Sequence, residues 1–327
     1  MPTATAAQAS LTSNNLEIIP VMSLTEVFKI LKGVSKPAPI KEANNVPIKP
    51  PEYPLDTLIG HERAKRALAI SAAGKHAILF TGPPGTGKTA LCKALPSLLP
   101  PLTGEESLEV TKLHSLSTPI TAPVTQPPLR APHHTVTLTS FIGGGARPRP
   151  GDISLAHKGI LFLDELPEYP RAIVEALRQP LEDHFVTLSR IHGTITYPAD
   201  FLFAATMNPC ACGYAGHSTI PCTCSGAKIA AYQKKISGPV LDRIDLRVTV
   251  TAKSDEYILH TKTLPEFQQS NLLKQVTTAR AQQKTRYKRS NYYNTYATFE
   301  EVRTLFFLEN SAKKLAHTAA EKLSLSH

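Results

Sequence analysis

One glycine-rich octapeptide constrains the fold of this chain more than any other segment. It consists of Gly82, Pro83, Pro84, Gly85, Thr86, Gly87, Lys88 and Thr89. The apolar residues 77–81 precede it and a helical pattern follows it, which is the strand, loop and helix order of a phosphate-binding P-loop. Glycines let a backbone curl around phosphates, and the N–H groups at a helix N-terminus attract anions. The octapeptide therefore predicts an α/β P-loop domain that binds a nucleoside triphosphate, rather than a plain Gly/Pro turn.

A second motif predicts hydrolysis of the bound nucleotide. Residues 160–163 are apolar and are typical of a buried strand, and Asp164 and Glu165 follow at its carboxyl end, where α/β sheets bind ligands. Lys88 is expected to reach the β- and γ-phosphates. Thr89 and Asp164 are expected to hold Mg²⁺, and Glu165 to deprotonate the attacking water. The two acids could instead begin an ordinary helix, an alternative that the preceding P-loop disfavours.

Two further segments fit the same domain. A third buried run, residues 201–207, ends at Asn208, whose amide can donate and accept and so could position the attacking water. Residues 58–62 lead into an amphipathic helix over residues 63–72. Asn208 is therefore a third candidate catalytic residue beside the two acids.

The composition indicates a cytoplasmic protein with a polyanionic partner. The chain has 327 residues, 42% of them hydrophobic, and a formal net charge of +10. No segment approaches the 18 or more apolar residues of a membrane span, and residues 1–15 contain no Lys or Arg. Such a charge is typical of proteins that bind nucleic acid, although it can also serve solubility alone.

Two basic turns could contact DNA. Residues 135–142 alternate like a strand and lead into the exposed glycine-rich turn 143–151. Residues 185–190 and 194–197 are typical of a second hairpin. Arginine guanidinium groups suit a phosphate backbone, but both hairpins could equally be ordinary surface turns. The candidate DNA contacts are Arg147, Arg149 and Arg190.

Four of the five cysteines are clustered in one segment. They are Cys210, Cys212, Cys222 and Cys224. Two Cys-x-Cys pairs can supply four thiolates to a tetrahedral Zn²⁺, with redox-active or spare thiols as the alternative. His217 could substitute for one ligand, whereas Cys92, within the helix after the P-loop, is expected to be a small core residue.

Arg243 stands between Asp242 and Asp245 near the end of the nucleotide domain. Such a charged run is usually a solvated salt-bridge patch. In ring-shaped ATPases, however, a neighbouring subunit contributes an arginine that stabilises charge on the γ-phosphate. Arg243 is the candidate for that role.

The N-terminal part is expected to be separate from the nucleotide domain. Residues 16–21 are typical of a short strand, followed by a helix with Ser23 and Glu26 at capping-box spacing. Residues 35–54 contain six prolines and indicate a semi-rigid linker. The nucleotide domain is therefore expected to begin near Leu55.

Together these motifs resemble the magnesium-chelatase-like AAA+ family of bacteria. The resemblance implies an AAA+ ATPase with a three-layer parallel sheet, a helix-2 insert and pre-sensor hairpins. It also implies a hexameric ring that hydrolyses ATP with Mg²⁺, translocates on single-stranded or branched DNA and promotes branch migration during transformation. The resemblance is dense over residues 16–250 and weak over residues 270–327. Its motifs are the P-loop and residues 130–134, 143–145, 148–151, 161–168, 177–183, 207–210 and 237–246.

The resemblance also divides the chain. Residues 1–34 correspond to a remnant of a Lon-protease-like domain, 35–54 to the linker, 55–252 to the ATPase domain and 253–327 to a partial helical region. The Lon-protease-like domain is incomplete at the N-terminus, and the family's sensor 2 arginine has no counterpart near the C-terminus. The chain is therefore expected to be truncated at both ends. The alternatives to a DNA motor are therefore a magnesium-chelatase-type motor subunit and a nucleotide-binding remnant without motor activity.

Overall fold

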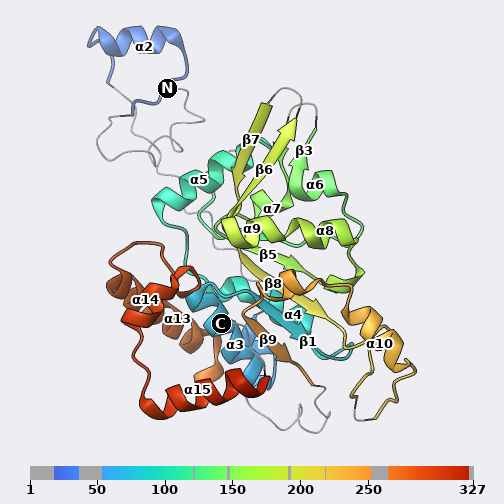
Figure 1. The fold of residues 1–327 in the computed structure, drawn as a ribbon. Helices are drawn as coiled ribbons and strands as arrows, with labels where there is room; N and C mark the ends of the chain where they lie inside the picture. Colours follow the sequence, from blue (N-terminus) through green and yellow to red (C-terminus); the bar gives the residue numbers. More distant parts are fainter. Residues whose placement is uncertain are drawn as a thin grey trace.

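Short apolar segments form a five-stranded parallel sheet at the centre of the structure (Figure 1). The strand order is β2, β5, β8, β1, β9, and every neighbouring pair is parallel. Parallel neighbours need long crossover connections, which cover both faces of such a sheet with helices. The α/β arrangement predicted from the P-loop is therefore confirmed. The strands are β1 (Ile78–Thr81), β2 (Leu129–Arg130), β5 (Ile160–Leu163), β8 (Leu202–Met207) and β9 (Leu246–Thr249).

The computed structural model describes residues 18–36, 54–120, 122–145, 148–190, 193–217, 219–251 and 264–323. None of the helices in these ranges combines the length and the apolar character that crossing a membrane requires. Other elements in these ranges are η1 (Leu55–Thr57), η2 (Leu95–Leu98), α5 (Gly104–Ser115), η3 (Leu166–Glu168), α9 (Arg178–Asp183), α10 (Gly226–Gln233) and η4 (Pro265–Phe267).

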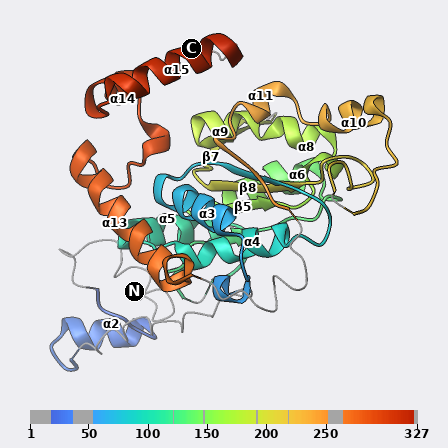
Figure 2. The same cartoon turned by 90° about the horizontal axis from the view of Figure 1, so that it is seen from below.

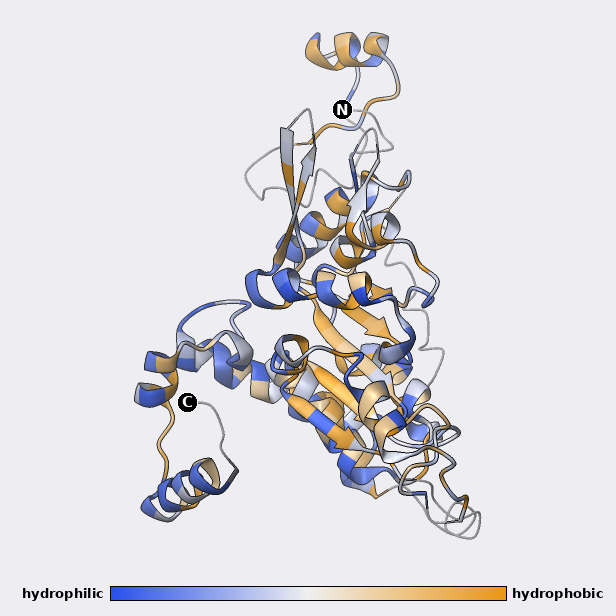
Figure 3. Cartoon of the chain, turned by 45° about the vertical axis from the view of Figure 1, so that its right-hand side comes forward, coloured by the Kyte–Doolittle hydropathy of each residue, from blue (hydrophilic) through white to orange (hydrophobic). Residues whose placement is uncertain are grey.

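The two faces of the sheet bury separate apolar cores, because strand side chains alternate between them. In β1, Ile78 and Phe80 belong to one core and Leu79 to the other. Figure 2 shows β5 and β8 between two helical layers, and Figure 3 shows the apolar strands inside more polar helices. The first face carries α3 (Glu62–Gly74), α4 (Lys88–Ala94) and α13 (Gln269–Tyr287), and the second α7 (Asp152–Leu155), α8 (Arg171–Ala176) and α11 (Gly238–Leu241).

Two antiparallel hairpins extend from one side of the sheet (Figure 1). The hydroxyl of Tyr197 in one hairpin donates to the carbonyl oxygen of Pro148 in the other at 2.9 Å. Leu188 also packs close to Gly143, so the two hairpins support each other at their bases. The second hairpin confirms the sequence prediction. The strands are β3 (Gly143–Gly144), β4 (Arg149–Pro150), β6 (Phe185–Arg190) and β7 (Gly193–Pro198).

The strand expected over residues 135–142 is wrong, because its second half is the helix α6 (Leu138–Ile142). The Thr137 hydroxyl accepts the Ser140 N–H at 3.2 Å and caps the first turn. Burial of Phe141 in the core then favours one helical turn over the alternating pattern. The glycines of the next turn also differ from expectation. Gly143 is buried at the base of the hairpin, where an added Cβ would meet the Arg149 carbonyl oxygen at 2.5 Å.

The helical C-terminal region attaches at the edge of the sheet where the strands begin. Asp200 forms ion pairs with Lys75 and Lys158, the latter at 3.0 Å. The Tyr296 hydroxyl donates to Asp200 at 2.5 Å and accepts from Lys75 Nζ at 2.6 Å. This largely buried charged cluster ties the segment after α13 to the central sheet. The remaining elements of the region are η5 (Asn294–Tyr296), α14 (Phe299–Leu305) and α15 (Asn310–Leu323).

Near the N-terminus, the helix α2 (Leu24–Leu31) lies apart from the sheet in Figure 1. Ser23 is the N-cap as predicted, since its hydroxyl accepts the Glu26 N–H at 3.3 Å. The Glu26 carboxylate accepts the Met22 N–H at 2.7 Å rather than that of Ser23, so only half of the predicted capping box is formed. Of the predicted strand before it, the described part shows one bridge residue, Val21. Residues 37–53, most of the predicted linker, lie outside the described residues.

Candidate functional site

The glycine-rich octapeptide forms the turn between β1 and α4, as predicted. Gly82 lies against the backbone of Val250, where an added Cβ would meet the carbonyl oxygen at 2.0 Å. Gly85 and Gly87 have φ angles of 76° and 81°, in the left-handed region that favours glycine. α4 begins at Lys88, directly after the loop, with the unpaired N–H groups of a helix N-terminus. This loop fits a phosphate cradle.

Lys88 folds back into the loop. Its Nζ donates to the carbonyl oxygens of Gly82 and Pro83 at 2.7 and 2.6 Å, and to Asn208 Oδ1 at 3.3 Å. The side chain is only 7% exposed. Burial lowers the pKa of Lys88, and two nearby carboxylates partly oppose this shift. A buried cation held by neutral acceptors can compensate the charge of a phosphate group.

The hydroxyl of Thr89 and the carboxylate of Asp164 meet where α4 and β5 adjoin. Thr89 Oγ1 lies 3.0 Å from each carboxylate oxygen of Asp164. Asp164 is half-buried and Glu165, the next residue, is exposed. Hydroxyl and carboxylate oxygens are the ligands that Mg²⁺ prefers. These two residues therefore fit a magnesium site beside the phosphate loop.

The structure adds Thr206, which the sequence analysis did not identify. Its side chain is fully buried in β8, and its hydroxyl donates to Asp164 Oδ1 at 2.5 Å. The same hydroxyl accepts the backbone N–H of Glu165 at 2.9 Å. The only sequence signal was one hydroxyl in an otherwise apolar strand. Thr206 thus holds both acids from the neighbouring strand.

Glu165 has an unusual backbone conformation for a residue other than glycine. Its φ angle is 54°, in the left-handed region, and it is the second residue after β5, which ends at Leu163. The turn leaves the side chain exposed, while the N–H bond to Thr206 secures the backbone. Asn208 follows β8, the strand next to β5. Parallel strand order therefore brings Glu165 and Asn208 to the same edge as the P-loop.

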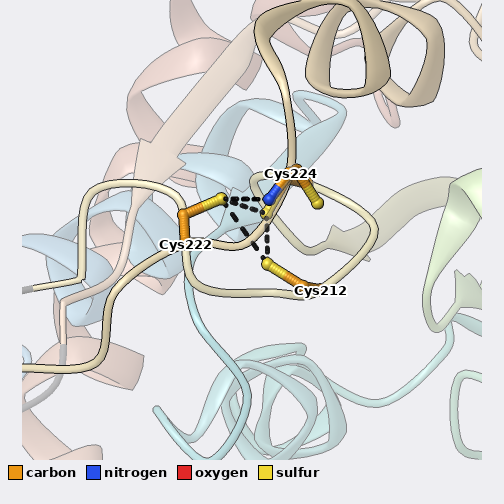
Figure 4. Close-up of side chains that lie close together, drawn as sticks. Cys212, Cys222 and Cys224 are labelled. Atoms are coloured by element: carbon orange, nitrogen blue, oxygen red, sulfur yellow. Dashed lines mark hydrogen bonds between the residues drawn. The ribbon is translucent and has the colours of Figure 1, made fainter.

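The four clustered cysteines come together in the loop after β8. Their sulfur atoms all lie within 4.8 Å of one another, and all four thiols are free. Figure 4 shows three of them, Cys212, Cys222 and Cys224, gathered in this loop. His217 is not part of the group, because its Nδ1 accepts the N–H groups of Thr219 and Ile220 at 3.2 and 3.1 Å. Cys92 is buried in the core, as predicted.

Arg243 forms an ion pair within its own chain. Its Nη2 lies 2.7 Å from Glu182 Oε2, and the two side chains are 39% and 59% exposed. Neither neighbouring aspartate supplies this partner, and Asp245 instead contacts His76 at 3.1 Å. An exposed pair of this kind is weakly held, so Arg243 is available at the surface.

The candidate DNA contacts belong to the paired hairpins. Arg149 lies in β4 and is exposed. Arg190 is the last residue of β6, opposite Gly193, and Arg147 lies outside the described residues. The two hairpins therefore place Arg149 and the backbone of Arg190 on one projection of the domain.

Comparison with known proteins identifies the family. The model of the family described as magnesium chelatase, subunit ChlI, matches residues 54–258. The chain belongs to this family. Together with the parallel sheet and the P-loop, this match confirms the AAA+ fold that the sequence predicted.

Several curated proteins are similar to the chain. YifB of Escherichia coli is 41% identical over 262 residues, which cover 79% of this chain and 50% of YifB. The competence protein ComM of Haemophilus influenzae is 46% identical over 203 residues, or 60% of this chain and 38% of ComM. The magnesium-chelatase 67 kDa subunit of Heliobacterium mobile is 27% identical over 195 residues, or 50% of this chain and 29% of that subunit. The chain thus spans about half the length of YifB.

Proposed function

We propose that this chain is the ATPase of a hexameric motor that moves on single-stranded or branched DNA. Its role would be helicase activity and branch migration in natural transformation and recombination. One observation carries the proposal. Lys88 Nζ donates to the P-loop carbonyl oxygen of Gly82, the Thr89 hydroxyl donates to Asp164, and Glu165 is exposed. ATP and DNA are both present in the cytoplasm, where we place this activity.

Each residue of the centre has a separate task in hydrolysis. Lys88 compensates the negative charge of the β- and γ-phosphates, and the P-loop N–H groups hold them. Thr89 and Asp164 would hold Mg²⁺, which would supply positive charge to compensate the phosphates. Glu165 is exposed and adjacent, so its carboxylate can take a proton from a water molecule. Asn208, bonded to Lys88 at 3.3 Å, orients that water.

Assembly into a ring would complete the site. Arg243 is half-exposed and held in its own chain by a single surface ion pair with Glu182. A neighbouring phosphate would attract this arginine more strongly than an exposed carboxylate does. In the proposed ring, each Arg243 therefore acts on the nucleotide of the adjacent subunit.

The paired hairpins are the proposed DNA contact. They project together from the sheet and are joined by the Tyr197 hydrogen bond, so they can present arginines as one surface (Figure 1). The net charge of +10 favours a polyanionic partner. The 46% identity to a protein named as a competence protein supports the same choice.

A magnesium-chelatase motor subunit is the second candidate, favoured by the family description itself. That activity uses the same ATPase centre but acts on a protein partner. The chain is only 27% identical to the Heliobacterium subunit, so this function is less favoured than the DNA motor. A remnant that binds nucleotide without motor activity is the third.

A DNA-stimulated ATPase assay on the purified chain separates these functions. A DNA motor should hydrolyse ATP faster when single-stranded or branched DNA is added. Lys88→Ala should abolish nucleotide binding or turnover, while Glu165→Gln should bind ATP and stall hydrolysis. Turnover without DNA stimulation would favour the chelatase-type motor, and binding without turnover the remnant. Equal turnover in Glu165→Gln and the wild-type chain would remove Glu165 from its proposed role.

A further inference from the structure

The four clustered cysteines have the geometry of a tetrahedral metal site. Sulfur-to-sulfur distances are 3.3 Å for Cys210 to Cys212, 3.6 Å for Cys210 to Cys222 and 3.5 Å for Cys212 to Cys222. Four sulfurs around Zn²⁺ at bond lengths of about 2.3 Å are separated by about 3.8 Å. The spacing of these three sulfurs is close to this value and far longer than a disulfide bond, and Cys224 Sγ lies within 4.8 Å of all three.

Backbone N–H groups surround the same sulfur atoms. Ala215 N–H donates to Cys210 Sγ at 3.3 Å, and Cys224 N–H donates to Cys222 Sγ at 3.4 Å. Such donors stabilise thiolate ligands and orient them toward a metal. Cys210 is fully buried and the other three are partly buried, so the cluster is a formed site and not a row of surface thiols.

The cysteine loop touches the phosphate-binding loop at two places. Gly213, one residue after Cys212, is buried with a φ angle of 88°, and an added Cβ would meet Cδ of Pro84 at 2.8 Å. Asn208, two residues before Cys210, accepts from Lys88 Nζ. Whatever holds the cysteine loop in shape therefore also supports Pro84 and Lys88.

We infer that Cys210, Cys212, Cys222 and Cys224 bind one Zn²⁺ and that this metal braces the nucleotide site. The four thiols lose their protons to solvent on binding, and the thiolates complete a closed tetrahedral shell. The metal crosslinks the two ends of the loop, which keeps Gly213 against Pro84 and Asn208 against Lys88. The bracing role rests on the proposed nucleotide binding, whereas the metal site does not.

Metal content tests the site directly. The full chain, purified without added zinc, should contain about one equivalent of Zn²⁺ when its metal content is measured by inductively coupled plasma mass spectrometry. Cys212→Ser and Cys224→Ser should each lose most of it, while Cys92→Ala should keep it, because Cys92 lies outside the cluster. Well under half an equivalent in the wild-type chain, or two disulfides among the four cysteines, would overturn the site.

ADP affinity tests the bracing role without requiring hydrolysis. Removing zinc with a chelator should weaken ADP binding roughly fivefold or more in calorimetry, and adding Zn²⁺ back should restore it. Gly213→Ala should keep its zinc but bind ADP more weakly, because the new methyl group displaces Pro84. Unchanged ADP affinity after complete zinc removal would overturn the bracing role. Loss of DNA stimulation alone would contradict the proposed motor and leave both zinc results standing.

Discussion

Replacing Thr206 by valine removes the hydroxyl that joins Asp164 to Glu165 while keeping the size and branching of the side chain. The hydroxyl makes one bond to a carboxylate, at 2.5 Å, and one to a backbone N–H, at 2.9 Å. A bond to a charged group contributes about 1.5–3 kcal/mol and a neutral one about 0.5–1.5 kcal/mol. Thr206→Val should therefore lower the free energy of unfolding by about 2–4 kcal/mol.

The same change should impair hydrolysis more than binding. Without the Thr206 bond, the Glu165 backbone can relax from its left-handed conformation, and Asp164 loses one of its hydrogen-bond partners while it keeps Thr89. A displacement of about 1 Å at a catalytic group can cost on the order of 10²-fold in rate. ADP affinity should change little, because the P-loop and Lys88 are untouched.

Thr206→Ser is the matched control, since it keeps the hydroxyl and loses only a buried methyl group. Thr206→Ser should lower the free energy of unfolding by about 1 kcal/mol, and its ATP turnover should be near that of the wild-type chain. Urea unfolding, steady-state ATP turnover and ADP calorimetry should be compared for both variants. If the valine and serine variants match in stability and turnover, the Thr206 hydroxyl does not hold the two acids in place.

Three other predictions concern separate parts of the molecule. Burial alone would raise the pKa of Asp200, but the adjoining ammonium groups outweigh it and hold that pKa well below the usual range. The ionised Asp200 carboxylate therefore stabilises the folded state. This contribution to the free energy of unfolding is fully present above the unfolded pKa of about 3.9 and is lost as pH falls below it. Asp200→Asn should lower the free energy of unfolding by about 3–5 kcal/mol at pH 7, as measured by urea unfolding. Between about pH 5 and pH 3 the variant should lose less stability than the wild-type chain. Parallel curves of unfolding free energy against pH would contradict this. Arg149→Ala should weaken DNA binding equally for all sequences and reduce the salt slope by about one unit, with ADP affinity unchanged; an unaltered slope would exclude a phosphate contact. Arg243→Ala should lower ATP turnover but not ADP affinity, and Glu182→Gln should keep normal turnover. Adding Lys88→Ala subunits, which keep Arg243, should partly restore turnover in mixed rings. Absence of this rescue would contradict action of Arg243 on a neighbouring subunit.

The nucleotide centre could be predicted because its pieces are local in sequence. The P-loop and the acids after residues 160–163 each follow an apolar strand. Parallel strands end at one edge of a sheet, so Lys88, Asp164 and Asn208, which each follow a predicted strand, could be expected at the same edge. The cysteine cluster was predictable for a similar reason, since its two pairs are separated by only nine residues.

Local pattern was insufficient where burial decided the conformation. Residues 135–142 alternate in a way typical of a strand, yet Leu138–Ile142 is helical because Thr137 caps it and Phe141 fills the core. The glycine-rich turn that follows was expected to be exposed. Gly143 is instead required by close approach of the Arg149 backbone, which is a tertiary contact.

Contacts between distant segments were decided by the tertiary structure alone. Thr206 reaches Asp164 across 42 residues, and Tyr296 reaches Asp200 across 96. Such pairs depend on strand register and helix docking, which no local pattern encodes. By itself, the sequence determined that this chain folds as a P-loop domain and which segments end at the same edge of its sheet. Only the packed sheet decided what holds those residues in place, because side chains far apart in sequence become neighbours only when the core closes around them.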